Sequence, residues 1–133
     1  MNTNAIPRWI LWYAGFLTLL SLSTSLMGYF APQYIFANLG IDFVQAEPIS
    51  YFYAARNVGV LVLCLFGLFT RDSKTLLAMF VLRFVVESLD LIATLKFGIG
   101  GMNPVVMAVT WLIVFLVPEF WAVVTLYKKE FTK

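Results

Sequence analysis

The chain has 133 residues, of which 62% are hydrophobic and 12% are charged, and its net charge is +2. A soluble chain of this length could not bury so much apolar surface, since ordinary soluble domains are about 45–50% apolar. The composition therefore predicts an integral membrane protein without a nucleic-acid partner. Because the sequence has no histidine and one cysteine, we expect no metal, no cofactor and no disulfide within the chain.

Four stretches have the ~20 mostly apolar residues that a transmembrane helix needs. They lie at about 8–30, 49–70, 75–97 and 104–127. Pro48 and Pro104 suit a first helical turn, and Asp72 and Asn103 can cap the third and fourth helices. The first stretch exceeds the apolar length of a signal peptide, so we expect a retained span. The predicted fold is all-α: a single domain, residues 1–133, forming an antiparallel bundle of four transmembrane helices.

The longest link between the predicted spans covers residues 31–47. Pro32 could begin a short helix there and Gly40 could end it. Tyr34 to Leu39 would supply an apolar side, which predicts an interfacial helix across the outer mouth of the bundle. A partly buried connector is the alternative.

Basic residues are distributed unequally between the predicted links and ends. One side of the membrane would hold Arg8, Arg71, Lys74, Lys128, Lys129 and Lys133. The other side would hold only Lys96. Since positive charge is retained in the cytoplasm, we expect a four-pass protein of the cytoplasmic membrane with both termini inside.

Five ionisable residues fall inside the predicted spans, and each costs roughly 2.5–3.5 kcal/mol at a helix centre. They are Arg56, Arg83, Glu87, Asp90 and Glu119. On the third span, Arg83, Glu87 and Asp90 share an arc of about 60°. Intramembrane charges usually face the bundle interior and pair with one another, so we expect this face to point inward.

Antiparallel helices place residues at equal distances from a turn at the same depth. Arg56 is then level with Asp90, and Arg83 is level with the residues next to Glu119. We therefore predict an Arg56–Asp90 pair in the outer half and a pair of Arg83 with Glu119 or Glu87 in the inner half. Two cations leave one carboxyl without a partner, and such a carboxyl takes up a proton. Glu87 is the candidate.

Small residues predict close packing around this cluster. The first span carries a stripe of them, namely Ala14, Thr18, Ser21 and Ser25. Gly59 and Gly67 flank Arg56 on the second span. On the fourth span, Pro118 should free a backbone carbonyl near Val114.

Several short motifs occur together: the outer loop with Pro32 and Gly40, the run Ala-Arg-Asn-Val-Gly at 55–59, and Arg83 with Asp90. In these motifs and in its length, the chain resembles the DoxX-like group of small four-helix bacterial membrane proteins. Some members of that group associate with quinone-linked redox enzymes. The resemblance implies a membrane accessory or small-ligand protein, and it assigns no catalytic residue here.

The favoured hypothesis is a non-enzymatic membrane protein that binds a small lipophilic or anionic ligand, such as a quinone or lipid, or a membrane partner. Its pocket would lie between Arg56, Asp90 and Tyr53. Membrane lipids, a second copy of the chain and a membrane enzyme are the expected partners. The alternative is an oligomeric transporter of protons or small solutes, with Glu87, Asp90 and Glu119 as a relay. A lipid-modifying enzyme is less favoured because no catalytic motif is found. The charges could also serve only to fix helix register.

Overall fold

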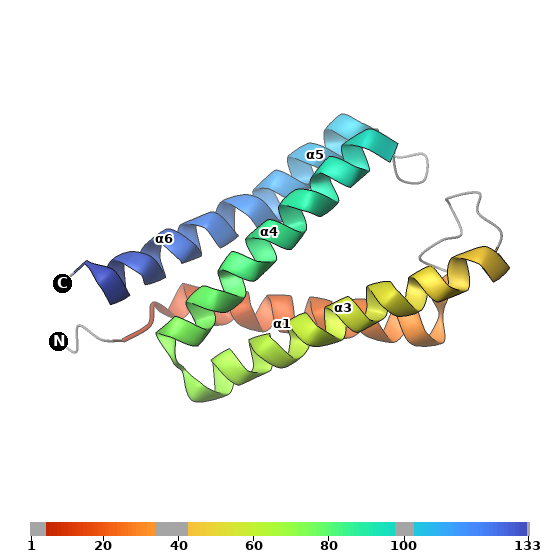
Figure 1. Ribbon diagram of the computed structural model, residues 1–133. Coiled ribbons are helices and arrows are strands. Elements are labelled where there is room, and N and C mark those ends of the chain that lie inside the picture. The colour runs from red at the N-terminus through yellow and green to blue at the C-terminus, as the bar shows by residue number, and fades with distance from the viewer. Residues whose placement is uncertain (1–4, 34–42, 98–102, 133) are drawn as a thin grey trace.

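The computed structural model describes residues 5–33, 43–97 and 103–132, and all regular structure in this part of the chain is helical (Figure 1). The long helices before residue 98 are α1 (Arg8–Phe30), α3 (Phe43–Thr70) and α4 (Ser73–Phe97). The last helical stretch consists of α5 (Pro104–Trp111), the π-helical η1 (Leu112–Leu116) and α6 (Val117–Phe131). The predicted all-α class is thus confirmed for the described residues.

The predicted start of the second helix is wrong. Helix α3 begins at Phe43 rather than at 49, so Pro48 lies inside it. Proline has no backbone N–H, so Pro48 removes one hydrogen bond near the N-terminal end of α3, and the helix tolerates this loss. Pro104 does lie in the first turn of α5, as predicted. The predicted interfacial helix would run from Pro32 to Gly40; residues 32 and 33 are helical, and the rest of it lies outside the described residues.

The helices form two antiparallel hairpins, α1–α3 and α4 with α5–η1–α6 (Figure 1). The turn at Arg71 and Asp72 joins the hairpins at the end where both termini lie, and they diverge toward the opposite end. A buried apolar core from α1, α3, α4 and α6 holds them together. It consists of Ile10, Ala14, Leu17, Val60, Cys64, Leu76, Met79, Phe80, Ala122 and Leu126.

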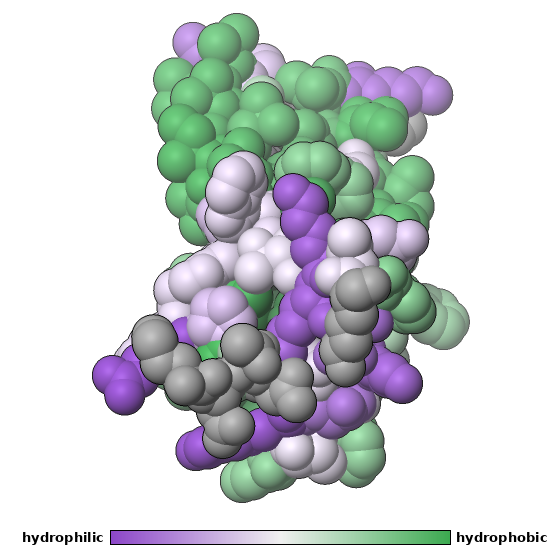
Figure 2. Space-filling model, turned by 90° about the vertical axis from the view of Figure 1, so that its left-hand side faces the viewer, coloured by the Kyte–Doolittle hydropathy of each residue, from purple (hydrophilic) through white to green (hydrophobic). Residues whose placement is uncertain are grey.

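Much of the outer surface is apolar. Three helical segments are long and apolar enough to cross a membrane: Arg8–Phe30, Glu47–Thr70 and Pro104–Phe131. Large hydrophobic side chains are exposed on these segments and on α4. Figure 2 shows hydrophilic residues gathered at the end that carries the termini, with hydrophobic residues over much of the helices behind. These features are those expected of a membrane protein.

Both predicted helix caps are confirmed. The Asp72 carboxylate accepts hydrogen bonds from the backbone N–H of Thr75 at 2.8 Å and from its hydroxyl at 2.7 Å, at the start of α4. These bonds favour the charged form, so the pKa of Asp72 lies below its ordinary value. At α5, the side chain of Asn103 accepts from the N–H of Val105 at 2.9 Å. The caps set where both helices of the second hairpin begin.

The freed carbonyl predicted from Pro118 is also observed. Proline cannot donate to the carbonyl of Val114, and that oxygen instead accepts a hydrogen bond from the Tyr13 hydroxyl at 2.9 Å. The backbone adjusts by widening into η1, where the N–H of Val117 bonds the carbonyl of Leu112. The Val114 carbonyl, which Pro118 leaves free, therefore connects the second hairpin to α1 through the Tyr13 hydroxyl.

Helices α1 and α3 are in close contact at Gly28. The hydroxyl of Ser50 donates to the carbonyl of Gly28 at 2.6 Å, and a Cβ added at Gly28 would lie 2.7 Å from the Cβ of Ala54. The small-residue stripe of α1 is buried, as predicted. The expected close packing is found at Gly67, but it is wrong for Gly59, which has nothing within 4 Å of an added Cβ. The free space arises because Gly59 is on an exposed face of α3.

Gly28→Ala is expected to destabilise the protein by about 1–3 kcal/mol, because the added methyl group must push α3 away from α1. Thermal unfolding of the purified protein in detergent would measure the loss. Gly15→Ala is the matched control, since Gly15 is also in α1 and has nothing within 4 Å. We expect it to be neutral or slightly stabilising, because alanine is the better helix former. Equal melting temperatures for the two variants would contradict the close contact.

Candidate functional site

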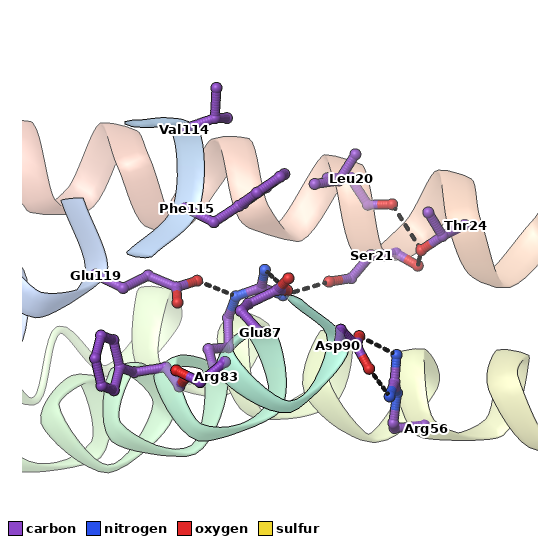
Figure 3. Close-up of polar contacts among 12 residues, drawn as sticks. Leu20, Ser21, Thr24, Arg56, Arg83, Glu87, Asp90, Val114, Phe115 and Glu119 are labelled. Atoms are coloured by element: carbon purple, nitrogen blue, oxygen red, sulfur yellow. Dashed lines mark hydrogen bonds and ion pairs between the residues drawn. The ribbon is translucent and has the colours of Figure 1, made fainter. Parts of the chain in front are cut away.

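The outer charged pair joins the two hairpins (Figure 3). Arg56 of α3 binds Asp90 of α4 through two parallel hydrogen bonds, Nη1 to Oδ1 at 2.9 Å and Nη2 to Oδ2 at 2.7 Å. The Arg56 guanidinium also lies 5.1 Å from the centre of the Tyr53 ring. The Arg56 and Asp90 side chains are 39% and 29% exposed, so the pair is only partly buried. The predicted pairing is confirmed.

The inner cluster is centred on Arg83 of α4, and it is almost completely buried. Its Nε donates to Glu119 of α6 at 2.8 Å, and its Nη2 donates to Glu87 at 2.5 Å. Its Nη1 is 3.5 Å from the Ser21 hydroxyl of α1, at the long limit of a hydrogen bond. In Figure 3, Arg83 lies between the two carboxyls, with Ser21 facing it from α1. Arg83 was predicted to pair with Glu119 or Glu87, and it pairs with both.

The prediction that Glu87 lacks a cation is wrong. A guanidinium presents five donors in a fork, so Arg83 can serve Glu87 and Glu119 together. The prediction fails because it assigns a single carboxyl to each arginine. The unsatisfied atom belongs to Glu119 instead, because its Oε2 is buried and has no hydrogen-bond partner. Among the five intramembrane ionisable residues, three are acidic and two are basic.

A cavity of about 200 Å³ lies between the hairpins, lined by residues of α1, α3, α4, α5 and η1. Its polar wall is formed by ion-paired side chains, namely Arg56, Arg83, Glu87 and Asp90. Its aromatic wall is formed by Tyr53, Trp111 and Phe115. The pocket predicted between Arg56, Asp90 and Tyr53 is therefore present, whereas Glu119 lies behind Arg83 and does not line it. Residues 34–40 of the predicted interfacial helix, across the outer mouth of the bundle, lie outside the described residues.

Sequence reasoning missed the contribution of α5 and η1 to this cavity. Trp111 ends α5 and Phe115 lies in η1, and their rings are tilted by 54° to each other with centroids 5.1 Å apart. The indole N–H of Trp111 is buried near the Glu87 carboxyl, but no acceptor meets hydrogen-bond geometry. A tryptophan inside a span, away from the interface that it prefers, was the available signal.

No protein-family model, curated protein or solved structure matches this chain. The resemblance to the DoxX-like group therefore stays a prediction. The function has to be inferred from the chemistry of the cavity and its charged wall.

Proposed function

We propose that this chain is a four-pass membrane protein that binds a small lipophilic ligand between its two hairpins, without catalysing a reaction on it. The observation that carries the proposal is a cavity with aromatic and apolar surfaces that ends on a fixed set of ion-paired side chains. Ligand pockets commonly combine apolar walls with a few polar groups that orient the ligand.

The fourth span in this proposal is α4. It has 25 residues, which corresponds to about 37 Å of helix and is enough to cross the hydrocarbon core. Its central charges, Arg83, Glu87 and Asp90, are all engaged in ion pairs, two of which reach α3 and α6. Pairing lowers the cost of placing charges in the membrane, so these residues are compatible with a span.

Membrane orientation can be tested with single cysteines in a Cys64→Ala background. In bacterial cells, Gln33→Cys after α1 should react with an impermeant maleimide, because we place that end outside. Lys74→Cys at the start of α4 should react only after permeabilisation, because the basic residues gather on the cytoplasmic side. Labelling of position 74 but not 33 in intact cells would show the opposite orientation.

The geometry favours a lipophilic ligand over an anionic one, because both guanidiniums are already bound to carboxylates. The cavity is smaller than the roughly 300–1,000 Å³ of common ligand sites. A small molecule fits it whole, while a lipid or quinone would insert its head and leave its tail among the membrane lipids. The resemblance to the DoxX-like group makes a quinone-linked membrane enzyme a partner to test.

Proton or small-solute transport is the second candidate. The observation in its favour is the link from the fully buried Glu119 through Arg83 to Glu87 on the cavity wall. Chains of intramembrane carboxyls serve as proton relays in pumps and transporters. The two functions differ in what they require of Glu87. A proton relay requires the Glu87 carboxyl to gain and lose a proton, whereas a neutral ligand requires only the volume and hydrogen bonding of the side chain.

A neutral ligand should stabilise the protein by about 2.7 kcal/mol at a hundredfold excess over its dissociation constant. Thermal unfolding with quinones and with lipids would reveal it. Glu87→Gln should weaken that binding only modestly, since glutamine keeps the volume and hydrogen bonding of the side chain. Glu130→Gln, at the end of α6, is the control. Dissipation of a pH gradient in vesicles that is lost in Glu87→Gln, with no stabilising ligand, would instead support transport.

A further inference from the structure

The charges around the cavity indicate the chemical class of its ligand. We propose that the cavity selects a ligand with a positive charge on an apolar body, such as a protonated aromatic amine, and that Glu87 receives the charge. This inference rests on the proposed function, because it concerns the ligand of the same cavity.

Neither arginine is available to an anion. Both terminal nitrogens of Arg56 bind Asp90, and its guanidinium lies against the Tyr53 ring. The nitrogens of Arg83 face Glu119, Glu87 and Ser21. An anion would have to displace a carboxylate of the protein from its own cation, and it would meet the carboxyls of the wall.

Carboxyl groups, in contrast, outnumber guanidiniums in the inner cluster. Arg83 alone faces Glu87 and Glu119, and the second oxygen of Glu119 is buried without a partner. Glu119 is fully buried, but Glu87 lines the cavity, and its side chain is 11% exposed. Only one Glu87 oxygen accepts a hydrogen bond from Arg83. A cation beside Glu87 would therefore balance the cluster from the one direction that a ligand can reach.

The aromatic wall suits the same ligand. The faces of tryptophan, tyrosine and phenylalanine rings attract cations, and tryptophan does so most strongly. At Tyr53 the ring already lies close to a cation, the Arg56 guanidinium. Trp111 and Phe115 provide further rings, and Leu20, Val60 and Val86 provide apolar surface for the body of the ligand.

Three probes of nearly equal size separate charge from shape: benzylammonium, benzyl alcohol and benzoate. Their binding to the full-length protein in an uncharged detergent would be measured by calorimetry at fixed salt, because screening weakens charge effects. We expect benzylammonium to bind about tenfold more tightly than benzyl alcohol, in line with one cation–aromatic or charge-assisted contact. Benzoate should not bind measurably.

Glu87→Gln should lose about tenfold in benzylammonium affinity, equivalent to one charge-assisted contact, and almost nothing in benzyl alcohol affinity. Glu130→Gln should bind all three probes as the unmodified protein does. The comparison of probes on the unmodified protein does not depend on whether Glu87→Gln folds.

Two results overturn the inference in different ways. Equal or tighter binding of benzyl alcohol or benzoate would reject charge selection and leave the ligand-binding function standing. Binding of none of the three probes would reject the inference, and if quinones and lipids also failed to stabilise the protein, the proposed function would fail with it.

Discussion

Arg83→Met is expected to cost about 3–5 kcal/mol of stability. Methionine fills a similar space but leaves Glu87 and Glu119 buried and facing each other without a cation. Glu119 is the more severe case, because its side chain is completely buried and one of its oxygens already has no partner. Denaturant unfolding of the purified protein in mixed micelles would measure the loss.

A second set of substitutions shows whether the loss comes from charge. Adding Glu87→Gln and Glu119→Gln to Arg83→Met should restore part of the stability, because two neutral amides replace the uncompensated carboxyls. Arg8→Met, at the exposed start of α1, is the matched control and should change stability by less than about 0.5 kcal/mol. A loss for Arg83→Met as small as that for Arg8→Met would show that the buried ion pairs contribute nothing.

Arg56→Ala is expected to cost about 1–3 kcal/mol, less than the loss at Arg83, because the pair with Asp90 is partly exposed. The variant removes both hydrogen bonds to Asp90 and the contact with the Tyr53 ring. Asp90→Asn in the same background should recover part of the loss, since it removes the unpaired charge. The four proteins form a double-mutant cycle that isolates the energy of the pair.

We expect a coupling energy between 0.5 and 3 kcal/mol in that cycle, the range of residues in direct contact. Arg56→Lys is a further control, because lysine keeps the charge but cannot form two parallel hydrogen bonds. It should recover only part of the stability. Additive effects of Arg56→Ala and Asp90→Asn would contradict an energetic role for the ion pair.

Several features of this protein could be predicted because they depend on near neighbours along the chain or on depth within the helix bundle. Apolar runs of sufficient length indicated the helices, and Asp72 and Asn103 indicated where two of them begin. The Arg56–Asp90 pair could be predicted because α3 and α4 are antiparallel and joined by a short turn. Residues at equal distances from that turn therefore lie at the same depth in the bundle. The carbonyl released by Pro118 followed from the missing N–H of proline.

The cavity could be predicted only in part. Tyr53, Arg56 and Asp90 were identified because charge and aromatic character are rare inside a span. Trp111 and Phe115 were not, because their place beside the cavity depends on how α5 and η1 pack against the other helices. This packing depends on how the apolar side chains of the helices fit together, which helical periodicity does not specify.

By itself, the sequence determined which segments are helical, which faces carry charge and which charges can meet. Hydrophobic length and helical spacing are sufficient for each of these. Only the tertiary structure decided that one guanidinium holds two carboxyls, that the hairpins diverge and that an aromatic cavity opens between them. These features arise from the relative placement of helices distant in the chain, where small differences in side-chain packing select one arrangement among several with the same pattern.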